Sequence, residues 1–419
     1  MPDRSVAPEF VPPKKFKLPN PDRIEFNTGA RFFFLNAGDQ PIIKLEFICR
    51  AGSWFETAPG IAFFTGKMLL EGTRSFNSRE IAQKLDHYGA FIDISPGFDY
   101  LSISIHIPTR HFEKVGHIIL ELLLDPAFPD HELDLMKQIQ IQQLKINEQK
   151  NKFLASRLFR SYLYGKYPYG HIMSEEVINN ITSENIINHF ETYVKGKFDI
   201  FMTGNFEFTF QERILKFFGE HSVMHHPFDK KTALINDPFE HYIERKDSLQ
   251  SSVYMGKRSI NRDDLNYGKV LLLNEAFGGY FGSRLMQNIR EEKGLTYSIY
   301  SHLVSLKNSA YFVISSDVKK EKKDLVVNEI NNEIEKLKSV GIDHEELVQV
   351  KNYLKGSILN TLTTPFALTE KLKNIYYYDL NEDFYENLFD EIDQTSSNEL
   401  LSLANEVLFN EPLSTVIVG

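Results

Sequence analysis

Arg290 and Tyr297, in the second half of this 419-residue chain, are residues whose types could hold a polarised carbonyl group. A guanidinium can donate hydrogen bonds to a peptide carbonyl, and a phenol can donate to an oxyanion that develops at a scissile bond. Their spacing leaves a plainer interpretation open, in which Arg290 lies at the surface near a helix end and Tyr297 is half-buried in a strand. Arg284 is a third candidate, which could instead serve packing or an ion pair.

These residues belong to one segment, Gly278-Gly-Tyr-Phe-Gly-Ser-Arg-Leu-Met-Gln-Asn-Ile-Arg-Glu-Glu-Lys-Gly-Leu-Thr-Tyr297. Its glycines suggest a phosphate-binding loop, but the Gly-Lys-Ser/Thr ending and the GxGxxG spacing are both missing. A tight turn before the helix that carries Arg284 and Arg290 explains the glycines more simply.

A second segment, Gly60-Ile-Ala-Phe-Phe-Thr-Gly-Lys-Met-Leu-Leu-Glu-Gly-Thr73, is predicted to be an apolar helix followed by a break. The preceding residues, 56–60, include Pro59 and provide a start signal, and Gly72 stands where helices commonly end. The helical spacing gives one buried face, made of Ile61, Phe64, Met68 and Leu69.

Together the two segments resemble the pitrilysin/insulinase-like zinc peptidases, the M16 family of inverzincins. The first is similar to that family's Gly-Leu-Ala-His-x-x-Glu-His-Met-Leu-x-x-Gly-Thr frame, and the second to its Gly-Gly-x-x-x-Ser-Arg-Leu…Arg-Glu…Gly-Leu-x-Tyr pattern. The resemblance covers nearly the whole chain after an N-terminal arm. It implies an α+β fold of two duplicated LuxS/mitochondrial-processing-peptidase-like metallohydrolase domains. In that family the arginine and the tyrosine hold the substrate across the cavity from zinc.

The groups that bind zinc in that family are missing here. Its two zinc-binding histidines fall on Phe63 and Lys67, its general-base glutamate falls on Gly66, and its third ligand falls near Gln143. Catalytic zinc needs imidazole or carboxylate lone pairs. Phe63 has none, and a protonated Lys67 would repel a cation. We therefore expect no metal and no other cofactor in this chain.

Some bacterial enzymes of this family are heterodimers, in which one subunit supplies zinc and the other supplies the Arg/Tyr pair. The resemblance implies a subunit of the second kind, inactive alone, which contributes Arg290 and Tyr297 to peptide hydrolysis by a zinc-bearing partner, with Arg284 as a further substrate-binding residue. A homodimer remains possible without that partner. Two other classes stay open: an inert structural homologue, like the core subunits of a respiratory complex, and a stand-alone peptide-binding module.

The chain repeats its own order. Asp130-His-Glu-Leu133 introduces a helix in the first half, and Asp343-His-Glu-Glu-Leu347 does so in the second half, 213 residues later (343 − 130 = 213). Such a period indicates a duplication, and consecutive strands followed by helices favour α+β layers. The predicted parts are an N-terminal arm (1–22), a first domain (23–220), a linker (221–231) and a second domain (232–419).

Composition limits the partners and the compartment. The formal net charge of −10 argues against nucleic acid or an anionic membrane as the main partner. Cys49 is the only cysteine, so no internal disulfide can form. Since the N-terminus has no signal-type apolar core and no apolar run is long enough to span a membrane, we expect a cytoplasmic protein, or a periplasmic one if a signal was removed.

Two further features have alternative interpretations. The predicted strand Phe91–Ser95 could be an edge to which a substrate peptide adds as an extra strand, or an ordinary protected edge. His221, His225 and His226 could bind a metal, but they lie beside Pro227 with no cysteine nearby, so a solvated linker is the preferred interpretation.

Overall fold

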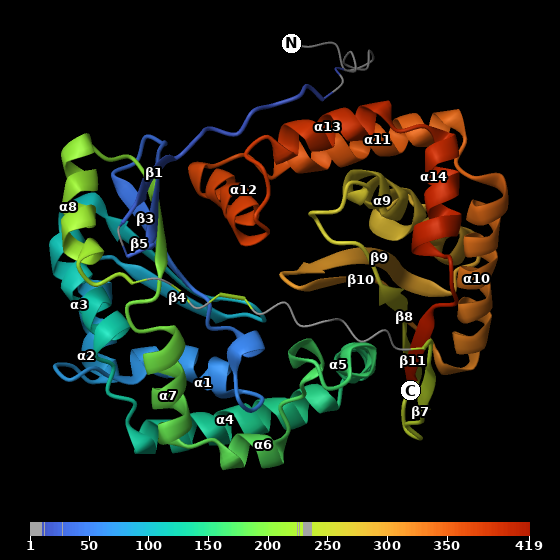
Figure 1. Cartoon of the computed structure of the whole chain (residues 1–419). Coiled ribbons are helices and arrows are strands. Elements are labelled where there is room, and N and C mark those ends of the chain that lie inside the picture. Colours follow the sequence, from blue (N-terminus) through green and yellow to red (C-terminus); the bar gives the residue numbers. More distant parts are fainter. Residues whose placement is uncertain (1–10, 12, 27, 224, 226, 229–236) are drawn as a thin grey trace, which may run out of the picture.

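Two mixed β-sheets, one from each half of the chain, organise the protein (Figure 1). The computed structural model describes residues 11, 13–26, 28–223, 225, 227–228 and 237–419. The first sheet has the order β1-β2-β6-β3-β5-β4 and the second β7-β11-β8-β10-β9. The strands of the first sheet are β1 Asp22–Glu25, β2 Arg31–Asn36, β3 Ile42–Cys49, β4 Phe91–Pro96, β5 Leu101–Pro108 and β6 Asp199–Gly204. Those of the second are β7 Glu240–Ile243, β8 Gln250–Arg258, β9 Thr296–Leu306, β10 Ser309–Lys319 and β11 Ser414–Val418.

The two sheets share one topology. Apart from β1, each strand of the first sheet has a counterpart at the same place in the second: β2 matches β7, β6 matches β11, β3 matches β8, β5 matches β10 and β4 matches β9. The pairing directions agree as well, since β2–β6 and β7–β11 are the parallel pairs and the corresponding remaining pairs are antiparallel. This repeat confirms the predicted duplication and the α+β class.

The helices repeat in the same way. The first half has α1 Ile61–Met68, α2 Ser78–His87, α3 Phe112–Leu124, α4 Asp130–Glu148, α5 Asn151–Tyr164, α6 Glu175–Asn180, α7 Ser183–Tyr193 and α8 Phe208–Gly219. The second has α9 Tyr267–Asn274, α10 Lys323–Val340, α11 His344–Asn360, α12 Pro365–Tyr377, α13 Phe384–Gln394 and α14 Ser397–Leu403. The 213-residue offset carries α4 onto α11 and α5 onto α12.

Each half lends one helix to the other half's sheet. Helix α5 packs on β8 and β11 of the second sheet, where Phe159 and Leu163 join a buried cluster with Tyr254. Helix α12 packs on β6 of the first sheet, where Thr369 hydrogen-bonds Thr203 and the buried Lys373 pairs with Glu46. Figure 1 shows both helices in the space between the sheets. Because α5 and α12 are counterparts in the repeat, the halves hold each other reciprocally.

The N-terminal arm also crosses to the second half. Residues 1–10 and 12 of the predicted arm lie outside the described residues. Leu18 is buried in the core of the second half, and the Phe16 ring lies edge-on to Phe389 of α13 at 5.2 Å between centroids. The described part of the arm therefore packs on the second half.

Among the described residues, no helix is both long and apolar enough to cross a membrane.

Candidate functional site

Helix α1, which carries the positions of the missing zinc ligands, is held at its start by a buried carboxyl group. Gly60 precedes it with φ of 95°, a left-handed conformation that glycine adopts without strain. Glu56 accepts hydrogen bonds from the backbone N–H groups of Gly60 and Ala62, both at 3.1 Å. Burial raises the pKa of Glu56 to about 7, although these two bonds favour the carboxylate. The helix then buries Ile61, Phe64, Thr65 and Met68, among others.

Gly66, at the position of the family's general base, has no room for a side chain. A Cβ atom there would lie 2.8 Å from Cδ1 of Leu101 and 2.9 Å from Cγ of Pro96. These contacts are too short for carbon atoms, so α1 packs closely on β4 and β5 because residue 66 is glycine. A glutamate at this position would require α1 or the side chains of Leu101 and Pro96 to shift.

Lys67 and Phe63 occupy the positions of the family's two zinc-binding histidines. The ammonium of Lys67 donates to the backbone carbonyl of Ile94 at 2.7 Å. Ile94 lies in β4, an edge strand of the first sheet, as predicted for Phe91–Ser95. Phe63 is half-buried and packs edge-to-face on Phe64, with 5.4 Å between ring centroids. Neither side chain offers a lone pair to a metal.

The third degenerate position, Gln143, is exposed on α4 and does not line the cavity beside α1. From that helix the cavity takes Gln140, Leu144 and Asn147 instead. Throughout the described chain, no three His, Cys, Asp or Glu side chains come together as a metal site. Zinc therefore does not fit the residues present.

The cavity beside α1 has a volume of about 610 Å³. It lies between α1, the end of β4, and helices α4 and α5, and Tyr254 of β8 contributes from the second half. Lys152, Arg157 and Arg160 of α5 bring positive charge to it, and Glu56 is a carboxyl group in its lining. None of these residues was predicted from the sequence as part of a site. Arg157 and Arg160 follow Phe153 and Ser156 at helical spacing, a pattern that places all four on one face of a helix.

Arg284 stabilises the second half. Its Nε and Nη2 atoms donate to the two carboxylate oxygens of Glu346 at 2.8 and 2.6 Å, and Nη2 also donates to the carbonyl of Gly341 at 2.6 Å. This bidentate pair ties the segment to the start of α11 and the end of α10. The structure thus favours the ion-pair interpretation of Arg284 over substrate binding.

Arg290 and Tyr297 lie apart from the cavity beside α1, whose lining includes neither of them. Arg290 is in a π-helical segment, Met286–Glu292, with its guanidinium 4.6 Å from the ring centroid of Phe281 and 3.3 Å from a carboxylate oxygen of Glu291. Tyr297 is 91% exposed, where half-burial was the plainer expectation. Among the described residues, its hydroxyl has no hydrogen-bond partner.

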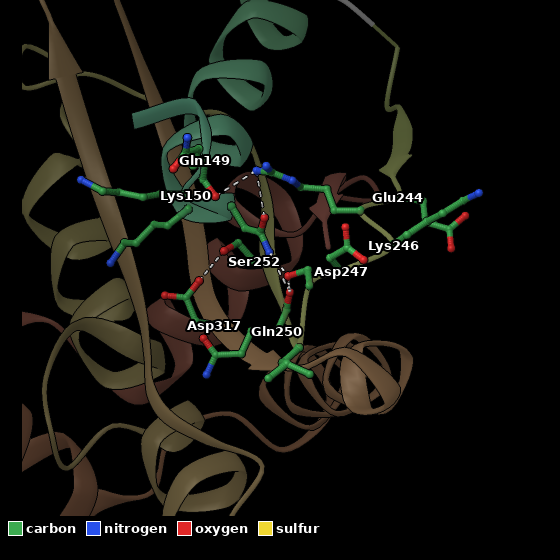
Figure 2. A pocket seen from close by; sticks show the side chains of 13 residues that line it. Gln149, Lys150, Glu244, Lys246, Asp247, Gln250, Ser252 and Asp317 are labelled. Carbon is green, nitrogen blue, oxygen red and sulfur yellow. Dashed lines mark hydrogen bonds between the residues drawn. The ribbon is translucent and has the colours of Figure 1, made fainter. Parts of the chain in front are cut away.

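An irregularity in β9 places Tyr297 opposite Asp317, a residue that lines a second cavity. Ile299 pairs with Ser316 and Thr296 pairs with Val318, so Tyr297 and Ser298 both lie opposite Asp317. Asp317 lines a cavity of about 880 Å³, shown in Figure 2, where the side chain of Ser252 points toward it and donates a hydrogen bond. Lys152 lines this second cavity as well as the one beside α1. Lys152 is thus shared by the lining of the two cavities, and Asp317 of the second lies opposite Tyr297 in the sheet.

The two described histidines of the predicted linker differ, since His221 is exposed and His225 is buried. His225 is buried, and its Nε2 atom lies 2.8 Å from Oδ2 of Asp199 in β6. Arg31 of β2 and Tyr376 of α12 contact the same carboxylate. A solvated linker was thus the wrong interpretation for His225, because the buried charge of Asp199 draws it into the protein. His226 lies outside the described residues.

Comparisons with known proteins agree with the fold. Residues 37–173 match the family model "Insulinase (Peptidase family M16)", and residues 180–354 match "Peptidase M16 inactive domain". An uncharacterized zinc protease, YmxG, of Bacillus subtilis is 24% identical over 405 residues, which cover 95% of this chain and 98% of that protein. A protein described as non-peptidase homolog YmxG, from Helicobacter pylori, is 24% identical over 355 residues, 81% of this chain and 80% of that protein.

A solved structure described as a peptidase M16 inactive domain, from Pseudomonas fluorescens, superposes with a TM-score of 0.88 at 24% identity. The match covers 96% of this chain and 98% of that one. The structure of a protease from Helicobacter pylori gives a TM-score of 0.84 at 16% identity, over 96% of this chain and 99% of that one. At these identities the likeness establishes the fold.

Proposed function

Because the chain belongs to peptidase family M16, we propose that it is the zinc-lacking subunit of a two-subunit M16 peptidase, to which it supplies Arg290 and Tyr297. The two halves are M16-type domains, and the positions of the zinc ligands and the general base carry Phe63, Lys67 and Gly66. Zinc would be bound by the partner, where it would activate the attacking water.

The proposal rests on the exposed side chain of Tyr297. A phenol that is 91% exposed at an edge strand, with no hydrogen-bond partner in the described chain, is available to a molecule outside it. In the complex its hydroxyl would donate to the oxygen of the attacked carbonyl, where negative charge develops. Arg290, held beside Phe281, would donate to a neighbouring peptide carbonyl and would keep the substrate in position.

A second candidate is a peptide-binding protein without peptidase activity. The description of the Helicobacter pylori relative as a non-peptidase homolog favours it, as does the roomy cavity beside a helix that cannot hold zinc. A homodimer or a purely structural role would require no zinc-bearing partner. For the compartment we propose the cytoplasm, since the single cysteine gives the chain no internal disulfide.

The test is co-purification from the native source, followed by a peptidase assay of each subunit alone and of the two recombined. We expect a zinc-bearing M16 subunit to co-purify, neither subunit alone to be fully active, and activity to return on mixing. Within that complex, Arg290→Ala should chiefly raise KM, because its guanidinium contacts the peptide in the ground state as well as in the transition state. A partner that is fully active alone, or the absence of any zinc-bearing partner, would favour the peptide-binding candidate.

A further inference from the structure

The cavity beside α1 contains an arginine without an acidic partner, Arg160. Its Nε atom donates to the carbonyl of Tyr169 at 2.9 Å, and its guanidinium lies 4.8 Å from the ring centroid of Phe98. Burial lowers the pKa of Arg160, and no carboxylate in the described chain lies within ion-pair distance to offset that effect. Since a guanidinium stays charged at neutral pH, this cavity holds a cation that still has N–H donors to offer a ligand.

The cavity as a whole is positively charged, although the chain carries a net charge of −10. Arg157 is satisfied by Glu148 at 3.1 Å and by the carbonyl of Met173. Lys152, like Arg160, has no ion-pair partner among the described residues. Glu56 is a single carboxyl group and cannot balance both cations, and its Oε2 atom already accepts the two N–H bonds at the start of α1.

The remaining walls of the cavity are largely apolar. Phe63, at the position of a zinc-binding histidine, forms one of them, and Phe98, Leu144, Phe153 and Met173 form others. The volume of about 610 Å³ falls within the range of roughly 300–1,000 Å³ that small-ligand sites occupy. A site of this shape takes a ligand that combines an anionic group with apolar surface.

We propose that this cavity binds a carboxylate borne next to an apolar side chain, with Arg160 as its bidentate partner and Lys152 at its mouth. Arg160 presents a planar fork that suits a carboxylate, and Lys152 connects the site with the cavity of Figure 2. That the carboxylate comes from a peptide rests on the proposed function. Its source is then a C-terminal residue or an internal aspartate or glutamate.

Calorimetric titration of the full chain without any partner tests this with three probes. They are N-acetyl-Leu-Phe with a free C-terminal carboxylate, the same dipeptide as its amide, and N-acetyl-Asp-Phe-amide. We expect at least one acid to bind about tenfold or more tightly than the neutral amide, and Arg160→Gln to remove that preference, as truncation of a buried charge pair does. Arg213→Gln, which removes an arginine paired with Glu113 outside the cavity, is the matched control.

The site is supported if the free-acid dipeptide, the aspartyl peptide or both bind more tightly than the neutral amide. Which of them does so identifies the source of the carboxylate. Equal binding of acids and amide, or an unchanged preference in Arg160→Gln, overturns it. Should Arg160→Gln fail to fold, Lys152→Gln, an exposed position, must weaken the acids selectively, and no effect there also overturns it. Because these titrations need neither zinc nor a partner, failure of the two-subunit proposal would leave their result intact.

Discussion

The two edge strands, β4 and β9, hold the same place in the repeated topology and differ in their surroundings. At β4, the ammonium of Lys67 occupies the carbonyl of Ile94, and α1 packs so closely that residue 66 must lack a side chain. At β9, the pairing has an extra residue opposite Asp317, and Tyr297 is 91% exposed. The duplication thus preserved the backbone pairing, while side chains closed one edge and left the other open to an outside molecule.

The surroundings of the first edge are close packing at Gly66 and a charged hydrogen bond from Lys67, and both stabilise it. At the open edge, the side chain of Tyr297 is exposed instead. We therefore expect substitutions at β9 and at the cavity cations to affect function most, and substitutions around β4 to affect stability most.

The largest effect on stability is expected at Asp199, whose side-chain partners come from both halves of the chain. Burial opposes ionisation of Asp199, but the hydrogen bond and charge of His225, with those of Arg31 and Tyr376, lower its pKa to about 2. Asp199→Asn should cost about 3–5 kcal/mol, because it leaves a buried cation uncompensated. Urea midpoints measure this, with Asp134→Asn, an exposed carboxylate, as the control; equal midpoints would contradict it.

The same carboxylate gives the stability a pH dependence. Since the pKa of Asp199 is lowered in the folded state to about 2 from an ordinary value of 3.8, its contribution is present above about pH 4 and is lost as the pH falls toward 2. Asp199→Asn should flatten this part of the profile of unfolding free energy against pH. A variant that loses stability as steeply as the wild type between pH 4 and pH 2 would show that other groups are responsible.

Tyr297→Phe tests the open edge directly. In a complex with a zinc-bearing partner, we expect turnover per zinc to fall by about 10²–10³-fold, the usual effect of removing one donor to a developing oxyanion. The melting temperature should not change, because the side chain is exposed. Phe91→Leu, at an exposed position of β4, is the matched control and should leave turnover unchanged. Full turnover in the Tyr297→Phe complex would show that β9 does not contribute to catalysis.

Gly66→Ala tests the closed edge. The added methyl group would lie under 3 Å from Leu101 and Pro96, so we expect a loss of about 1–3 kcal/mol in unfolding free energy, typical of overpacking. Gly356→Ala, in α11, is the control, since its methyl group would meet only Pro13 at 3.9 Å and should be neutral or slightly stabilising. A Gly66→Ala protein as stable as the wild type would mean that α1 can move off β4.

The smallest effect is expected for Lys67→Met, which keeps the apolar stem and removes the donor to Ile94. One hydrogen bond at a half-buried position contributes about 0.5–1.5 kcal/mol. Amide hydrogen exchange in β4 should accelerate modestly while exchange in β9 stays unchanged. Lys114→Met, on the exposed face of α3, should alter neither strand. Unchanged exchange in β4 would show that Lys67 does not protect that edge.

Local patterns predicted the elements well and the site only in part. The strand predicted at Phe91–Ser95 is β4, Phe91–Pro96, and the helix predicted within residues 60–73 is α1, Ile61–Met68, because local residue patterns determine such elements. The absence of zinc ligands could also be predicted from residue types alone. The sequence left the ion pair of Arg284 as one alternative and did not show which face of α4 meets the cavity, because both depend on distant segments.

The sequence by itself determined the duplication, the α+β class and the absence of zinc-binding groups at Phe63 and Lys67, because periodicity and lone pairs are local properties. Only the tertiary structure decided that α5 and α12 exchange sheets, that His225 is drawn to Asp199, and that Arg160 has no acidic partner within the described part of the chain. These features join residues far apart in the chain, and packing selects their partners by shape and charge after the elements have formed.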